Sequence, residues 1–361
     1  MSAVGDMLRL ARQRKGFTQK YASERLGIVQ PVLSRYENGI SEPDDALLMK
    51  AAQVYEVPTE FFQIKETVYG PPVSVHPMTR AKADVTGREL DMVTAELNLR
   101  VMHIRRFLEG VDFEPSRSFP FLDVEENGSP ERIAGIVRAH WGIGSGPLKN
   151  LTGYVESAGI IVGMSDFSGA SISGITFKVP GQPPLVLLNK SHPADRLRFT
   201  LAHELGHIVM HRFPTPAMED EANQFASALL MPERDIRAAF TGRKVTLQLL
   251  ASLKPEWKVA MQALLVRVKA LNIIDGNQAR YLWQQISSRG WRLREPPELD
   301  FPQEDTVVLK SMIKAHLSEL GYSLKELASI VPLREGDFVS MYGLEVDAPS
   351  KRAMPKLRII S

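Results

Sequence analysis

The 361-residue sequence contains no cysteine. Its absence excludes a disulfide scaffold, a thiolate zinc cluster, an iron–sulfur centre and a cysteine nucleophile. Any metal must therefore be bound by His, Asp or Glu. The sequence also lacks an apolar run of about 18 residues, the length that a transmembrane helix needs, and it begins without the apolar stretch of a secretory signal. We therefore expect a cytoplasmic protein with no membrane partner.

The sequence also lacks a large excess of charge of either sign, because its formal net charge is only +2. The chain as a whole is not a polycation, so any surface that binds nucleic acid must be local. The apolar fraction of 44% and the charged fraction of 24% are ordinary for globular proteins and argue against a mainly disordered chain. At about 150 residues per domain, the length predicts two to three domains.

Glycine, proline and breaks in composition divide the chain into regions. We predict a helical domain, a linker with a helical segment, a central core and a helical C-terminal region, at residues 1–66, 67–130, 131–242 and 243–361. Short β-branched runs within the core predict strands, at 159–162, 172–179 and 185–188. The predicted class is α+β and multidomain, with an all-α N-terminal domain, a core of helices with a small sheet, and a helical C-terminal extension.

Residues 18–39 have the pattern of two short helices joined by a tight turn. Thr18 can cap the first helix, and Gly27 follows its end. This is the helix-turn-helix layout, in which the second helix enters the major groove of DNA. Residues 1–36 contain seven basic and two acidic residues, so they carry +5 and the remainder carries −3. Such a local basic face attracts phosphates, although charge alone also fits a small helical bundle with a solvated basic face.

The segment TQKYASERLGIVQPVLSRYENGISEPDDALLMKAAQVYEVP, residues 18–58, closely resembles the phage-repressor-like (XRE or Cro/C1-type) helix-turn-helix family. That resemblance implies a double-stranded DNA operator as partner, and a homodimer if the operator is palindromic. The DNA-binding residues that it implies are Gln19, Gln30, Val32, Ser34, Arg35 and Asn38. Gln19 and Asn38 would contact phosphates, whereas the start of the second helix would read bases.

Two positions depart from the family pattern. Val29 stands where a capping Ser or Thr is usual, and Pro31 cannot make a polar side-chain contact. Direct readout therefore falls mainly on Gln30 and Arg35, which typically pair with adenine and guanine respectively.

The strongest chemical motif is His203-Glu204-Leu205-Gly206-His207, which lies in a proline-free stretch. On a helix, residues four apart share a face, so His203 and His207 can converge on one metal ion. Glu204 points about 100° away from His203 around the helix. It can take a proton from water at the metal without being a ligand itself. The alternative is a helix with two histidines on its polar face that bind nothing.

A catalytic zinc site needs a third protein ligand and an open position. The next predicted helix starts with three acidic residues, and its buried stripe centres near Ala222. Glu219 lies about 60° from that stripe, so we predict it as the third ligand. A charged first turn, which is favourable to the helix dipole, accounts for Asp220 and Glu221.

Two neighbouring residues are predicted to support the ligands rather than to bind the metal. Asn223 lies one turn below Glu219 and can orient a ligand from outside. His211 continues the i+4 row of His203 and His207, but a fourth protein ligand would close a site that catalysis needs open. The strands before the motif are either plain core strands or an edge for an extended substrate.

The segments RFTLAHELGHIVMHR and EDEANQFASALLMP closely resemble the ImmA/IrrE family of metallopeptidases, and the resemblance covers about residues 80–295. It implies a zincin-like metallopeptidase core at 131–242, with Zn²⁺ (or Mn²⁺) on His203, His207 and Glu219 and with Glu204 as the catalytic residue. The implied function is a regulatory zinc metallopeptidase that cleaves a helix-turn-helix transcriptional repressor and so relieves repression. The alternative is a DNA-binding transcriptional regulator or antitoxin whose metal site is structural or sensory, without turnover.

Overall fold

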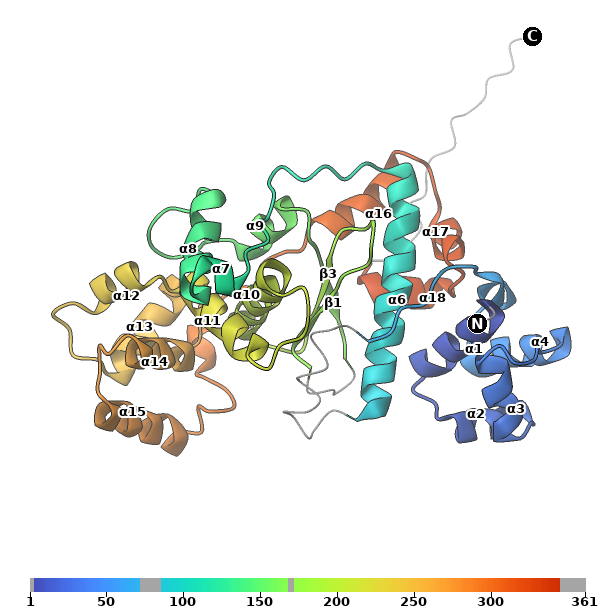
Figure 1. Cartoon of the computed structure of the whole chain (residues 1–361), viewed down its shortest axis with the longest axis horizontal. Coiled ribbons are helices and arrows are strands. Elements are labelled where there is room, and N and C mark those ends of the chain that lie inside the picture. The colour runs from blue at the N-terminus through green and yellow to red at the C-terminus, as the bar shows by residue number, and fades with distance from the viewer. Residues whose placement is uncertain (1–2, 72–85, 168–171, 345–361) are drawn as a thin grey trace, which may run out of the picture.

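A bundle of short helices begins the chain (Figure 1). The computed structural model describes residues 3–71, 86–167 and 172–344. The N-terminal elements are α1 (Ala3–Arg14), α2 (Gln19–Leu26), α3 (Gln30–Glu37), α4 (Asp45–Tyr55) and the 3-10 helix η1 (Thr59–Gln63). The helix-turn-helix pair predicted from the sequence is α2 and α3, and its apolar core includes Ala22, Leu26 and Leu33.

Local chemistry explains where these two helices start and stop. The side chain of Thr18 accepts a hydrogen bond from the backbone N–H of Tyr21 and so caps α2, as predicted. Gly27 adopts a left-handed φ of 73°, which lets the chain turn sharply toward α3. Val29 precedes α3 without any side-chain cap. The missing cap is the departure that the sequence predicted at this position.

The long helix α6 (Gly87–Gly110) connects the N-terminal bundle with the rest of the protein. Thr86 and Glu89 form a capping box that fixes its start. The helical segment predicted within 67–130 is thus observed from Gly87, and residues 72–85 lie outside the described residues. One face of α6 joins the core of the N-terminal bundle through Ala95, Leu99 and Met102. Another face joins the core of the central sheet through Val93, Leu97 and Val101.

Three strands form the central sheet: β1 (Ile161–Ser165), β2 (Gly174–Phe177) and β3 (Leu185–Asn189). Their order is β1-β3-β2, with β3 parallel to β1 and antiparallel to β2. Alternate residues of a strand point to opposite faces of its sheet. Leu185 and Leu187 accordingly pack with α6, whereas Val186 and Leu188 pack with the helices on the other face. The result is a layer of helices on each side of the sheet.

The helices of the central region are α7 (Val124–Asn127), α8 (Pro130–His140), α9 (Leu151–Ser157), α10 (Ala194–Met210), α11 (Met218–Leu230) and α12 (Glu233–Phe240). The helix α10 packs against β2 and β3, and α11 packs along α10. Gly206 allows this close approach, because a Cβ there would lie 3.3 Å from Cα of Ala222. The helix with the His203–His207 motif is therefore held between the sheet and α11.

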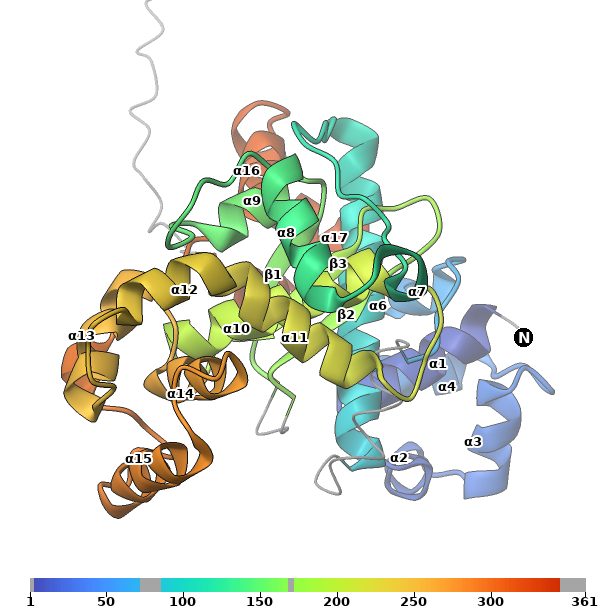
Figure 2. The same ribbon diagram turned by 60° about the vertical axis from the view of Figure 1, so that its left-hand side comes forward.

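The C-terminal helices are α13 (Leu247–Trp257), α14 (Met261–Ala270), α15 (Gly276–Ser288), η2 (Pro297–Leu299), α16 (Val308–Ser318), α17 (Leu324–Ile330) and α18 (Glu335–Tyr342). Helices α13 to α15 lie at the end of the molecule opposite the N-terminal bundle in both views (Figures 1 and 2). Helices α16 to α18 pack in the same hydrophobic core as α6 and the sheet.

The predicted fold class is confirmed: a helical helix-turn-helix region precedes a helix-rich region with a small three-stranded sheet, and C-terminal helices follow. The domain boundaries at 66, 130 and 242 stay predictions. Cores are shared across them, since Val331 and Leu333 pack into the core of the N-terminal bundle. Among the described residues, no helix is both long and apolar enough to cross a membrane.

Candidate metal centre and nucleic-acid interface

His203, His207 and Glu219 come together where α10 meets the first turn of α11. The two histidine Nε2 atoms are 3.0 Å apart. Oε1 of Glu219 lies 3.3 Å from Nε2 of His207, and Oε2 lies 3.5 Å from Nε2 of His203. Tetrahedral zinc with ligand bonds of about 2.0–2.1 Å separates its ligand atoms by roughly 3.3 Å. The spacing of these atoms therefore matches a zinc ligand set.

A second layer of side chains orients the two histidines. Nδ1 of His203 is 3.0 Å from Oδ1 of Asn223. Nδ1 of His207 is 2.9 Å from Nδ1 of His211, whose Nε2 is 3.0 Å from Oε2 of Glu221. An amide oxygen and a carboxylate accept hydrogen bonds only, so His203 donates from Nδ1 and His211 donates from Nε2. His211 Nδ1 then accepts from His207. Both motif histidines thus keep their Nε2 lone pairs for a metal.

Asn223 and His211 accordingly lie where the sequence predicted, each behind a motif histidine. The sequence interpretation missed Glu221, which it assigned only to the charged first turn of α11. Its carboxylate instead forms a pair with His211. Helix phase alone does not reveal this contact, because it depends on the angle at which α11 crosses α10. The sequence signal that pointed toward this contact was the i+4 spacing of His203, His207 and His211.

The candidate ligands shift one another's pKa values even without a metal ion. Burial would raise the pKa of Glu219, but hydrogen bonds and Coulomb attraction from His203 and His207 lower it to about 2. Burial would likewise lower the pKa of His203, yet Glu219 and the nearby Glu204 carboxylate raise it. Oε1 of Glu219 is buried and, apart from its 3.3 Å contact with Nε2 of His207, has no hydrogen-bond partner among the described residues. A divalent cation fits this arrangement, because it would satisfy that oxygen and both imidazoles.

Glu204 lies beside the candidate ligands but outside their set. Its side chain is buried, and its Oε2 accepts a 2.7 Å hydrogen bond from Oγ1 of Thr176 on β2. The carboxylate is close enough to His203 to affect the pKa of that imidazole. This position agrees with the geometry expected of a general base. Sequence reasoning did not find Thr176, since a threonine in a strand is ordinary.

A cavity of about 390 Å³ adjoins the centre and is lined by Thr176, Phe177, Lys178, His207 and Met218, among others. The segment Tyr69–Pro71 closes one side of it. The ammonium of Lys178 donates to the backbone oxygens of His207, Ile208 and His211, at the end of α10. Burial lowers the pKa of Lys178 to about 8. The cavity is large enough for a substrate side chain.

The candidate DNA-binding residues lie on α3, at its C-cap Asn38 and at the start of α2, where Gln19 is the first residue. Gln30 and Arg35 are exposed, whereas Val32 and Ser34 are half-buried. Nε2 of Gln30 donates a 2.7 Å hydrogen bond to Oε1 of Gln19, so two of the predicted DNA-binding residues are bonded to each other.

Gln19 in turn donates to Glu37 at 2.9 Å, and Glu37 forms a buried ion pair with Arg12. Asn38 accepts a hydrogen bond from Arg9 and donates one to Ser34. A chain of polar contacts thus runs from the buried Arg12–Glu37 pair to the exposed face of α3. It fixes the side chains that the resemblance assigns to phosphate contacts.

Comparison with known proteins identifies two domains. Residues 8–62 match the helix-turn-helix family model, and residues 155–269 match the IrrE N-terminal-like domain of peptidase family M78. A stretch of 66 residues is 39% identical to the HTH-type transcriptional regulator ImmR of Bacillus subtilis (strain 168). The match covers 18% of this chain and 52% of that relative, so the chain spans about half of the relative's length.

The chain therefore combines an XRE-type helix-turn-helix domain with an IrrE-like domain of a metallopeptidase family, as the sequence motifs indicated. The match at 155–269 runs from α9 through α14 and contains every candidate metal ligand.

Proposed function

We propose that this protein is a regulatory zinc metalloendopeptidase that binds an operator through residues 1–66 and cleaves a helix-turn-helix transcriptional repressor. The observation that carries the proposal is the convergence of His203, His207 and Glu219 beside the buried carboxylate of Glu204. Zinc suits two imidazoles and one carboxylate with an open position, and manganese is the second metal considered.

The residues of this chain have separate roles in that reaction. A divalent ion held by the three ligands would polarise the scissile carbonyl and lower the pKa of water. Glu204 takes a proton from the attacking water and returns it to the leaving amine. Thr176 holds one oxygen of Glu204 in place through its 2.7 Å hydrogen bond. Asn223, and His211 with Glu221 behind it, keep the imidazoles in the tautomer that binds metal.

An extended peptide is the substrate conformation that we infer. Among the described strands, β2 pairs only with β3, so it lies at an edge of the sheet beside α10. A peptide can add to such an edge through backbone hydrogen bonds. The 390 Å³ cavity next to His207 would then receive one of its side chains. A repressor is the proposed substrate because a helix-turn-helix domain brings this protein to operators, where repressors also bind.

The decisive experiment incubates the zinc-loaded full-length protein with the helix-turn-helix repressors encoded near it and identifies fragments by mass spectrometry. Glu204→Gln should keep the metal and reduce cleavage by about 10²–10⁴-fold, because glutamine cannot accept the proton. Asp220→Asn is the matched control, since Asp220 is exposed on α11 and outside the ligand set. It should cleave like the wild type.

The same pair of variants tests the alternative function. If the wild type and Glu204→Gln relieve repression of the target promoter equally, turnover is not the mechanism. The protein would then be a transcriptional regulator or antitoxin whose metal site is structural or sensory.

A further inference from the structure

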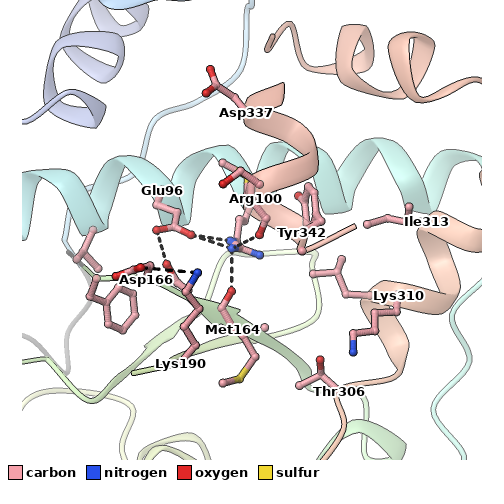
Figure 3. Close-up of a pocket in the computed structure, with 18 of the residues that line it drawn as sticks. Glu96, Arg100, Met164, Asp166, Lys190, Thr306, Lys310, Ile313, Asp337 and Tyr342 are labelled. Carbon is pink, nitrogen blue, oxygen red and sulfur yellow. Dashed lines mark hydrogen bonds and ion pairs between the residues drawn. The ribbon is translucent and has the colours of Figure 1, made fainter. Parts of the chain in front are cut away.

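Figure 3 shows a second cavity, of about 490 Å³. It lies at the other end of the sheet from the cavity beside His207 and shares no lining residue with it. Its walls come from α1, α6, α16 and α18 and from the carboxyl ends of β1 and β3. Those two strands are parallel, and the crevice at the carboxyl ends of parallel strands is a common place for ligands. The cavity therefore has a favourable position in the fold.

One wall of the cavity is a rigid polar frame. Arg100 is 2% exposed and forms an ion pair with Glu96 at 2.8 Å. Its guanidinium also donates to the backbone oxygens of Met164 and Met341, at 3.0 and 2.7 Å. Glu96 accepts a further hydrogen bond of 2.6 Å from Ser165. These contacts tie α6, β1 and α18 together, so the wall keeps its shape without a ligand.

Three other polar groups at the cavity are free of strong contacts to the described residues. Lys310 is exposed, and it has no ion-pair or hydrogen-bond partner within the described part of the chain. Lys190 lies 3.7 Å from Asp166, and both side chains are more than half exposed, so this pair is weak. Thr306 is only 8% exposed, yet its hydroxyl forms no hydrogen bond to any described residue. Figure 3 shows Lys190, Thr306 and Lys310 below the Glu96–Arg100 pair.

The remaining surface is largely apolar, with Val93, Phe167, Leu309 and Ile313 among the lining residues. A cavity of several hundred Å³ with apolar walls and a few polar groups is typical of small-molecule sites. Of the three polar groups, those without a partner among the described residues are the Lys310 ammonium and the Thr306 hydroxyl, which together favour an anion. An inorganic ion would leave the apolar surface uncovered.

We propose that this cavity binds a small organic anion, in which a carboxylate or phosphate is carried on a compact apolar body. The head group pairs with Lys310 and accepts from Thr306, and the body packs on Leu309 and Ile313. Arg14 of α1 lines the same cavity and forms a 3.1 Å ion pair with Asp337 of α18. The cavity therefore borders α1 of the N-terminal bundle as well. The inference requires no peptidase activity.

Calorimetric titration of the full-length protein tests this site. The probes are benzoate, phenyl phosphate, benzyl alcohol and benzylamine, which share an aromatic body and differ in the head group. We expect saturable binding of benzoate or phenyl phosphate, and the stronger of the two identifies the head group. Neither the neutral nor the cationic probe should bind.

Variants then locate the bound anion. Lys310→Ala and Thr306→Val should each weaken binding by about tenfold, as expected for a lost charge-assisted or buried hydrogen bond. Lys314→Ala is the matched control, because Lys314 is exposed on the same helix but does not line the cavity. The proposal is overturned if neither anionic probe binds, if benzyl alcohol binds equally well, or if Lys310→Ala binds like the wild type. These results do not depend on proteolysis, so they are distinct from a failure of the proposed function.

Discussion

The hydroxyl of Thr176 donates a 2.7 Å hydrogen bond to Glu204 and thereby joins the edge strand β2 to the helix that carries His203 and His207. Both partners are buried. A buried carboxylate that lost this bond would lack a partner that stabilises its charged form. The strand beside the proposed substrate path is thus also the element that positions the proposed general base.

The first prediction concerns this positioning residue. Thr176→Val has nearly the same shape as the wild type but removes the hydroxyl, so kcat for repressor cleavage should fall by roughly tenfold, or about 1.4 kcal/mol. Metal content should not change. Thr176→Ser keeps the hydroxyl, so it should restore kcat. A valine variant with wild-type kinetics would contradict the role.

The second prediction concerns the three acidic residues at the start of α11. Their alanine variants should differ in metal affinity, which competition with a chelator measures. Glu219→Ala should lose the ion, because only two protein ligands remain. Glu221→Ala should weaken binding by about 10–100-fold, since it releases His211 behind His207. Asp220→Ala should bind like the wild type. Loss of metal from Asp220→Ala, with retention in Glu219→Ala, would show that another carboxylate is the ligand.

The third prediction concerns DNA. Arg35 is exposed on α3, so Arg35→Ala should fold normally. It should weaken binding at the specific operator by about 1–3 kcal/mol and relax preference at one base pair. Gln19→Ala should weaken binding more evenly across sequences, because its proposed contact is a phosphate. Fluorescence anisotropy with matched and mutated operators measures both effects. If Arg35→Ala discriminates between the matched and mutated operators as strongly as the wild type does, Arg35 does not read a base.

The fourth prediction is a dependence of stability on pH that originates at His103. Burial lowers the pKa of this imidazole to about 3, and Tyr342 lies 2.8 Å from its Nδ1. In the unfolded chain the pKa is about 6.5. Between these values the unfolded state takes up a proton that the native state does not, so stability falls as the pH drops below about 6.5. The slope from this group is at most about 1.4 kcal/mol per pH unit.

Urea unfolding at pH 7.5 and pH 5 measures that slope. His103→Phe keeps an aromatic ring among Phe107 and Phe338 but cannot titrate. The loss of stability between the two pH values should therefore be smaller in the variant. An unchanged difference would assign the acid sensitivity to other groups.

Features encoded by short segments were the most predictable from the sequence. The cap at Thr18, the turn at Gly27 and the spacing of His203 and His207 each depend on a few neighbouring residues. Helix phase led to Glu219 as the proposed third ligand, and its carboxylate lies 3.3 Å from Nε2 of His207. Contacts that depend on packing between distant elements were not predictable. Thr176 meets Glu204 across 28 residues, and Arg100 meets Met341 across 241, so neither pair leaves a local pattern.

The sharing of α6 between two cores has a consequence for how the protein would act on DNA. Opposite faces of this one helix are buried in the two cores. We therefore expect α3, the second helix of the helix-turn-helix pair, and the candidate metal centre to keep a fixed orientation relative to each other. A repressor bound nearby presents a different side with each base pair of added spacing, and the duplex returns to the same orientation about every 10–10.5 base pairs. Cleavage on DNA would therefore rise and fall with the spacing between the two binding sites, in phase with the turns of the double helix.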